Sequence, residues 1–436
     1  MYKRQTAASG TPPITETNTF TPSSGRNYGA ALVQNTNKTV RTYAVANSVT
    51  SYPGVDSFAR LSGSAPGCQW AGEKVFKNDG SGSSLDIQEA VDDVAVRRIQ
   101  HSIKVANMSF GIFGPDGGPG TDSAVRDKVN NLVNNGVVAV VSAGNDGPGT
   151  DAANQVADPG RAALAITVGA SNDLNQLTSY TSSGFPSPAA SEDFKPDVIA
   201  PGGSVYYSMI LSTDSNDADA ALPTFADLQA NDYANMNGTS MAAPLVAGAA
   251  ALVIQALESQ GLQWSFTSSA HPLLVKMLLC MTATETNANR EASTGTNPAL
   301  GRAAAPKDPY EGYGIINPDA AVEAVTSHFA CGTISSSTAG GVFDRRAWAR
   351  QVQLSAGARV SLSLTVPQGG DFDLYLYAGA PDAKGNPVIL YHSTMPGNGV
   401  SESIALTASA SSTAYIVVKR ISGSGTWTLS GYIDAQ

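Results

Sequence analysis

Residues 238–244 read GTSMAAP, and a long run of small and apolar residues follows them as far as residue 257. This stretch predicts a buried core helix with Ser240 at its start, where a tight turn exposes the side chain. A serine hydroxyl becomes a nucleophile when a neighbouring base takes its proton, and the N–H groups of a helix start point to where an oxyanion would form. Gly238 allows a close backbone approach, and Pro244 suits the first helical turn, where its missing N–H costs nothing. The alternative is that Ser240 only caps the helix.

Outward from this helix, strands and helices alternate from residue 64 onward. Short apolar runs predict strands at 69–76, 103–108, 137–141, 163–169 and 197–200. Helical spacing of apolar residues predicts helices at 85–101, 121–135 and 272–282, the first with Ile87, Val91, Val94 and Ile99 on its buried side. The alternation predicts the α/β class, with a mainly parallel sheet covered by helices on both faces in three layers.

Near residue 330 the pattern changes to short strands and turns without an evident helix. Strands are predicted at 350–366, 372–378, 388–391, 401–406, 414–419 and 426–433, with glycine-rich turns between several of them. This predicts a small all-β sandwich of about 100 residues. We therefore expect three parts, an α/β domain at 64–328, an irregular N-terminal segment at 1–63 that is a remnant of the same domain, and a β-sandwich at 329–436.

The composition is typical of a secreted globular enzyme, with 42% apolar and 14% charged residues. The net charge of −10 argues against a nucleic-acid partner, because phosphate binding needs a basic face. The most apolar run, 242–257, has 16 residues, fewer than the ~20 that a membrane-spanning helix needs. A signal peptide is not visible, and the sequence leaves the oligomeric state open.

Three cysteines, Cys68, Cys280 and Cys331, allow at most one intrachain disulfide and leave one thiol over. The sequence does not pair them. Cys68 begins a predicted buried strand, so we expect it to be a core thiol. The cysteines lack the close spacing of a zinc site.

A second candidate for chemistry is Asn145. Residues 140–147 read VVSAGNDG, an apolar strand that ends in an asparagine between small residues. A carboxamide N–H at such a position can stabilise an oxyanion. Taken alone, the motif is more typical of an Asx-turn that closes a strand.

Six motifs together resemble those of subtilisin-like serine peptidases, over residues 64 to about 325 and in the same order. Besides GTSMAAP and the Asn145 strand end, they are APG at 65–67, NMSFG at 107–111, KPDVIAPG at 195–202 and GYGIIN at 312–317. The resemblance implies a subtilisin-like fold and a serine endopeptidase that acts on polypeptides. It implies that Ser240 is the nucleophile and Asn145 the oxyanion donor. It also implies two walls of a substrate cleft, Ser109, Phe110 and Gly111 on one side and Ser142, Ala143 and Gly144 on the other.

The predicted sandwich resembles the bacterial pre-peptidase C-terminal domain, which follows secreted peptidases. The resemblance is carried by DFDLYLY at 371–377, YIVV at 415–418 and GSG at 423–425. Asp371 and Asp373 are either ligands of a Ca²⁺ ion or, more commonly for such a pair, solvated. Calcium stabilises many members of the peptidase family, but no ligand set can be assigned here, and the chemistry itself requires no cofactor.

The resemblance fails at the catalytic aspartate and histidine, which precede the serine in this family. The family's His-Gly-Thr-His block and its Asp-Thr-Gly or Asp-Ser-Gly motif are absent. None of the four histidines has the motif context of a base: His101, His271, His328 and His392. We expect a 5′ truncation, with both residues encoded upstream of Met1, and a nearly inactive chain. The alternative is a catalytically dead pseudopeptidase that binds peptides.

Overall fold

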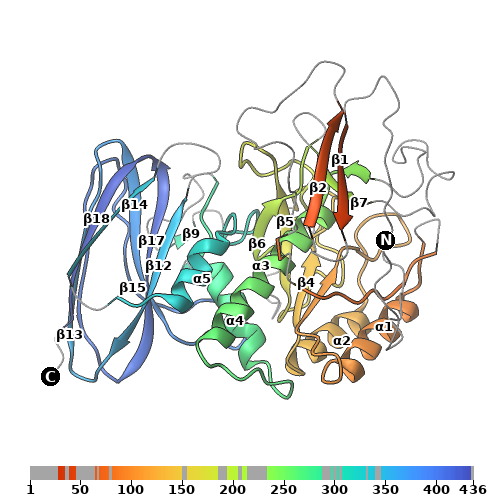
Figure 1. Ribbon diagram of the computed structural model, residues 1–436, viewed down its shortest axis with the longest axis horizontal. Helices are drawn as coiled ribbons and strands as arrows, with labels where there is room; N and C mark the ends of the chain where they lie inside the picture. The colour runs from red at the N-terminus through yellow and green to blue at the C-terminus, as the bar shows by residue number, and fades with distance from the viewer. Residues whose placement is uncertain are drawn as a thin grey trace.

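The fold is described from a computed structural model of the chain. It describes residues 28–34, 39–45, 64–65, 68–77, 81–149, 155–184, 194–204, 209–213, 233–286, 296–297, 302–303, 307–329, 332–338 and 345–433. Figure 1 shows a sandwich of strands on one side and a sheet with helices on the other, with α4 and α5 between them.

The α/β part is built on a parallel sheet with the strand order β3-β4-β5-β6. Its strands are β3 (Val105–Met108), β4 (Val138–Ser142), β5 (Ile166–Ser171) and β6 (Val198–Pro201). All five residues of β4 are buried, as expected for a strand with both faces covered. An antiparallel pair, β7 (Ile210–Thr213) and β8 (Tyr233–Met236), lies outside this sheet.

Helices cover both faces of the parallel sheet, so the predicted three-layer α/β fold is confirmed. On one face, alternate residues of β4 share a core with α1 (Ser84–Arg97) and α2 (Ser123–Asn134). On the other face, β4 packs against α3 (Thr239–Ser259) and α4 (Ala270–Thr282), with α5 (Pro318–Thr326) behind them. Side chains cap the starts of α1 and α2: Ser83 accepts from Asp86 N, and Asp122 accepts from Ala124 N and Val125 N.

Helix α3 is long and apolar enough, by length and composition, to cross a membrane. Its apolar residues are nevertheless part of the protein core, in contact with the sheet and with α4 and α5. The predicted core helix over 242–257 is therefore confirmed, and it extends to 21 residues.

Three predictions near the N-terminal end of the α/β part are wrong. Residues 69–76 form no strand, Trp70 is 72% exposed, and Cys68 is exposed rather than a core thiol. A strand exists only through pairing, and among the described residues β3 is an edge strand whose sheet partner is β4. Ile99 is 60% exposed because α1 already ends at Arg97.

Several elements were not predicted. Helix α5 follows Asn317 with a proline at its first position, a start signal that the sequence contains. The segment at 1–63, expected to be irregular, includes an antiparallel pair, β1 (Tyr28–Gln34) and β2 (Thr39–Val45). A short pair, β9 (Thr296–Asn297) and β10 (Arg302–Ala303), lies before α5. Cys331 lies outside the described residues.

The C-terminal part is a sandwich of two four-stranded antiparallel sheets. One sheet has the order β11-β18-β13-β16, and its strands are β11 (Gly332–Thr338), β13 (Arg359–Thr365), β16 (Glu402–Thr407) and β18 (Gly425–Ile433). The other has the order β12-β17-β14-β15, and its strands are β12 (Ala347–Leu354), β14 (Gly370–Ala378), β15 (Ile389–Ser393) and β17 (Ser412–Gly423).

The single strand predicted at 350–366 is in fact β12 and β13, which lie in different sheets. The chain turns between them, where Ala358 N donates to Ser355 O (3.0 Å) and Gly357 has a φ of +82°. The sandwich predicted from the other strands is present. Its interior is a separate core that includes Trp348, Phe372 and Trp427.

Candidate active site

The predicted nucleophile lies at the start of α3, directly after a constrained glycine. Gly238 is the N-cap and has a φ of +151°, a conformation that favours glycine. Its N–H donates to Gly202 O (2.9 Å), which ties the turn to the end of the KPDVIAPG segment. Ser240 follows two residues later and is partly exposed. The sequence prediction of a serine at an exposed helix start agrees with this geometry.

From the sequence we expected Pro244 in the first helical turn, but it lies in the second. The helix begins at Thr239, so the nitrogen of Pro244 stands where a helical N–H would bond to the carbonyl of Ser240. Ser109 Oγ donates to that carbonyl instead, at 2.8 Å. Ser109, predicted as a wall of the cleft, therefore also holds the backbone of the nucleophile.

Asn145 is oriented by the residue that precedes the nucleophile. Its Oδ1 accepts hydrogen bonds from Thr239 N (3.0 Å) and Thr239 Oγ1 (3.1 Å). Because a backbone N–H can only donate, the carboxamide oxygen must face Thr239, and the Nδ2 group must face the other way. Gly144 N donates to the same Thr239 hydroxyl (3.1 Å). Asn145 is exposed, so its N–H₂ group is accessible to a ligand.

The two predicted walls of the cleft are joined to each other. Ser142 Oγ donates to Phe110 O at 3.2 Å, so the ends of β3 and β4 are held side by side. The Phe110 ring packs edge-on against Phe76, with 5.3 Å between the ring centroids. Gly111 lies against Ala157, because a Cβ added at Gly111 would be 3.2 Å from the Cβ of Ala157. Ala143, at the end of the other wall, is fully buried.

The segment that contains Tyr180 and Ser182 connects the turn at Asn145 to the turn at Gly238, just before Ser240. Sequence reasoning missed this segment. On one side, Gly147 N donates to Tyr180 O (3.0 Å), and Asp146 N donates to Ser182 Oγ (2.9 Å). On the other side, the Tyr180 hydroxyl donates to Gly203 O (2.7 Å), next to the glycine that holds Gly238. Burial raises the pKa of Tyr180, so its phenol stays protonated and acts as a donor at neutral pH.

All four histidines lie on other elements. His271 belongs to α4, and its Nδ1 accepts a hydrogen bond from Ser265 N (3.0 Å). His392 belongs to β15 of the sandwich. The other two lie beyond the end of α1 and between α5 and β12: His101 and His328. The structure thus brings Ser240, Asn145 and the cleft walls together without a histidine from this set.

One group of carboxylates among the described residues is close enough to hold a metal ion, namely Glu285, Asp308 and Glu311, and all three are buried. Glu311 already accepts hydrogen bonds from Thr286 N (3.1 Å) and Thr286 Oγ1 (2.6 Å). The two acids suggested from the sequence, Asp371 and Asp373, accept from Gly397 N (3.1 Å) and from the Tyr375 hydroxyl (3.2 Å) respectively.

Comparison with known proteins gives a consistent result. A family model described as the subtilase family matches residues 29–302. Pyrolysin of Pyrococcus furiosus is 31% identical over 230 residues, which are 47% of this chain and 15% of pyrolysin. Subtilisin DY of Bacillus licheniformis is 29% identical over 269 residues, 62% of this chain and 73% of that protein.

The match thus spans only a small part of pyrolysin. Among solved structures, the pre-peptidase C-terminal domain of a Bacillus anthracis collagenase is 17% identical, with 24% of this chain and 93% of that chain covered and a TM-score of 0.21.

Proposed function

Since this chain belongs to the subtilase family, we propose that it is a serine endopeptidase that hydrolyses peptide bonds in polypeptides. Ser240 Oγ attacks the scissile carbonyl, the C–N bond breaks and the protonated amine leaves, and water then hydrolyses the resulting acyl-enzyme to the free acid and Ser240. Asn145 Nδ2 and the Ser240 N–H donate to the oxyanion. We also propose that the protein acts outside the cell and that its chemistry needs no cofactor, because both nucleophile and oxyanion donors are protein groups.

The orientation of Asn145 is the observation that supports this proposal most directly. Its oxygen is occupied by Thr239, the residue before the nucleophile, so its N–H₂ group faces away from Thr239 and is held as a donor. Preorganised donors of this kind stabilise the transition state without reorganisation. Within this family, removal of one such side-chain donor lowers kcat about 10²–10³-fold.

The proton of Ser240 must be taken by a group other than the four histidines of this chain. His271 and His392 lie on α4 and in the sandwich, and the other two lie on loops at element ends. A buried tyrosine with a raised pKa, such as Tyr180, is a poor base at neutral pH. We therefore expect residues 1–436 alone to turn over peptides very slowly.

Covalent labelling separates the nucleophile from the missing base. The chain is treated with a fluorophosphonate probe with and without added imidazole, and the adduct is located by mass spectrometry. We expect slow labelling of Ser240 that imidazole accelerates, because imidazole supplies an external base. Ser240→Ala abolishes the adduct, Asn145→Ala slows it, and the exposed serine variant Ser102→Ala leaves it unchanged.

Labelling that survives Ser240→Ala would refute the proposed nucleophile. Rapid peptide hydrolysis without imidazole, lost in Ser240→Ala, would show that a base within the chain has been missed. Tight peptide binding without any adduct would instead favour a peptide-binding module.

A further inference from the structure

Two neighbouring strands of one sheet of the sandwich, β14 and β17, are buried on both faces. In β17, seven consecutive residues are buried, and β14 has six in a row, whereas β13 alternates strictly between buried and exposed residues. One face of the sheet containing β17 forms the sandwich interior. The residues of its other face belong to the same core as α3, α4 and α5: Ala349, Tyr375, Tyr377, Tyr415 and Val417.

Helix α4 completes this shared core. Ten of its thirteen residues are buried, and a helix that is apolar all round requires neighbours on every side. The parallel sheet and α3 cover one side. In Figure 1, the sandwich lies along the other side of α4 and α5. Without the sandwich, the apolar surface of α4 that faces it would be in water.

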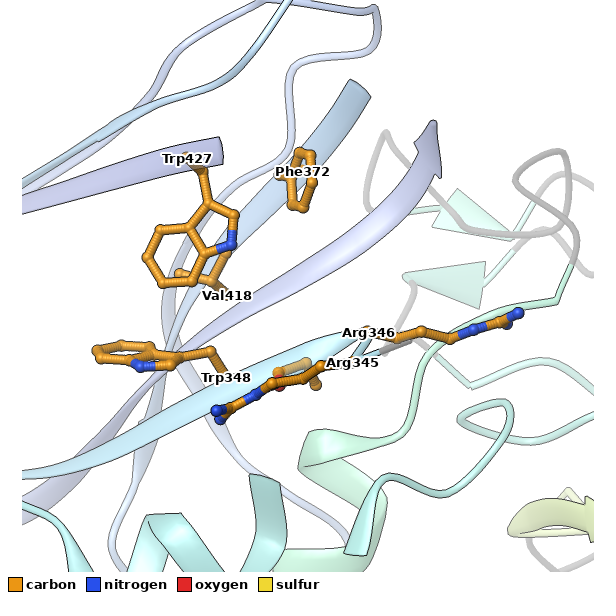
Figure 2. A pocket seen from close by; sticks show the side chains of 7 residues that line it. Arg345, Arg346, Trp348, Phe372, Val418 and Trp427 are labelled. Atoms are coloured by element: carbon orange, nitrogen blue, oxygen red, sulfur yellow. The ribbon is translucent and has the colours of Figure 1, made fainter. Parts of the chain in front are cut away.

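Charged side chains fasten α5 to the sandwich. Glu323 of α5 accepts from both Arg345 and Arg350 of the β12 region, with Arg350 at 2.8 Å. The Arg350 guanidinium also lies over the Trp348 ring, 4.6 Å from its centroid. Figure 2 shows Arg345 extending away from Arg346, beside Trp348. In the backbone, Gln351 N donates a hydrogen bond to Ser327 O (3.0 Å), so the chain leaving α5 is bonded to β12.

The loop at Gly385, between β14 and β15, also covers a buried charge cluster. This cluster consists of Asp197 and three lysines, Lys195, Lys276 and Lys307. Gly385 has a φ of +84°, and a Cβ there would be 2.9 Å from Lys276 Cδ and 3.0 Å from Leu273 Cδ2, both on α4. Beneath this loop, Lys276 Nζ donates to Ala163 O and Ala165 O (both 3.0 Å) and lies 3.3 Å from Asp197 Oδ1.

Asp197 forms salt bridges with three lysines, Lys195, Lys276 and Lys307. Lys195 Nζ lies 2.6 Å from Asp197 Oδ2, and Lys307 Nζ lies 2.8 Å from Asp197 Oδ1. All four side chains are at most 3% exposed. Asp197 directly precedes β6, and Asp197 Oδ2 also accepts from Thr167 N of β5 (2.8 Å). Buried charges of this kind depend on exclusion of water and on complete pairing.

We propose that the C-terminal sandwich is a permanent outer layer of the peptidase domain, which completes the core around α4 and seals the charge cluster at Asp197. The surface formed by α4 and α5 therefore has one occupant, the outer face of the β12-β17-β14-β15 sheet of the same chain. The working form of the protein retains the sandwich, and its removal by a protease unfolds the α4 region.

Calorimetry and hydrogen exchange on the full chain test this proposal. We expect one cooperative thermal transition for both parts, and slow exchange of the α4 amides. Val417→Asp places a charge on the outer face of β17 and should accelerate exchange in α4 at least tenfold. Ser361→Asp, at an exposed position of β13, should leave α4 exchange and the transition unchanged.

Two separate transitions, one for each part, would overturn the proposal without any variant. So would unchanged α4 exchange in Val417→Asp. If that variant does not fold, Glu323→Gln keeps the shape of the contact and removes its charge. It should accelerate α4 exchange at least about fivefold, and equal exchange in this variant and the wild type would also count against the proposal.

Discussion

The two sheets of the sandwich have similar size and topology but opposite burial. In β13, the sequence RVSLSLT alternates, and each exposed polar residue faces water. In β17, the sequence AYIVVKR at 414–420 is buried throughout. The interior face is apolar in both sheets, so the difference lies entirely in what covers the outer face.

This difference shows that the pattern of apolar residues in a strand indicates whether other elements cover the outer face of its sheet. An antiparallel sheet with one solvated face alternates, and a continuous apolar run indicates that both faces are covered. The runs DLYLYA and AYIVVK therefore contained evidence for a layer beyond the sandwich. In the structure that layer is α4 and α5, and the following predictions compare the covered sheet with the open one.

Truncating a tyrosine on each outer face should give the largest contrast. Tyr377 of β14 is fully buried against the α4 and α5 core, whereas Tyr432 of β18 is 58% exposed. We expect Tyr377→Ala to lower the free energy of unfolding by about 3–5 kcal/mol, as for large aromatic residues in cores. Tyr432→Ala should change it by less than about 1 kcal/mol. Urea unfolding of both variants measures the contrast, and equal effects would mean that the outer face is not a core.

The charge cluster beneath the covered sheet predicts a dependence on pH. Burial lowers the pKa of Lys195 from 10.5 to about 7, although Asp197 opposes this shift and the charges of Lys276 and Lys307 add to it. Between pH 7 and 10.5 the native state then binds fewer protons than the unfolded state, so stability should rise with pH. The rise should be a few kcal/mol.

Urea unfolding between pH 7 and 10 measures this slope. Lys195→Met removes the titrating group and should flatten the rise, while Lys104→Met, at a partly exposed lysine paired with Glu258, should keep it. A slope that persists in Lys195→Met would assign the effect to other groups.

The contact between the sandwich loop and α4 can be tested with matched glycines. Gly385 and Gly261 both have positive φ, +84° and +91°, but only Gly385 faces Lys276 and Leu273, because the space around Gly261 is open. Alanine strains the backbone at both positions by roughly 1–2 kcal/mol. Gly385→Ala should cost about 1–3 kcal/mol more through overpacking. Thermal unfolding measures the difference, and equal losses would show that the loop moves away freely.

Much of the fold could be predicted from local patterns. The apolar runs located β4, β5 and β6, and helical spacing located α1, α2 and α4, because each pattern lies within one element. The failures depend on neighbours. The apolar residues at 69–76 resemble a strand but have no pairing partner among the described residues, and 350–366 required recognition of the turn at Gly357.

The candidate site divides in the same way. The motifs around Ser240 and Asn145 were readable because each lies in one short stretch. The segment at Tyr180 and Ser182 was not, because its hydrogen bonds join turns that are far apart in the sequence. The sequence did contain a signal for the role of Ser109. Pro244 is the sixth residue of α3 and has no N–H, so the Ser240 carbonyl needs another donor, and Ser109 provides it.

The smallest contrast concerns ion pairs. Glu323 is 27% exposed and binds two arginines of the sandwich, whereas Asp92 is 49% exposed and pairs with Lys128 within the α1 and α2 layer. We expect Glu323→Gln to lower the free energy of unfolding by about 1–2 kcal/mol, because it removes charge-assisted bonds to two partners. Asp92→Asn should cost less than about 0.5 kcal/mol, as exposed pairs do.

High salt should reduce the effect of Asp92→Asn more than that of Glu323→Gln, since partly buried pairs are screened less. Urea unfolding at low and high salt tests both statements, and if the two variants respond alike, the contact between α5 and the sandwich behaves as an ordinary surface pair.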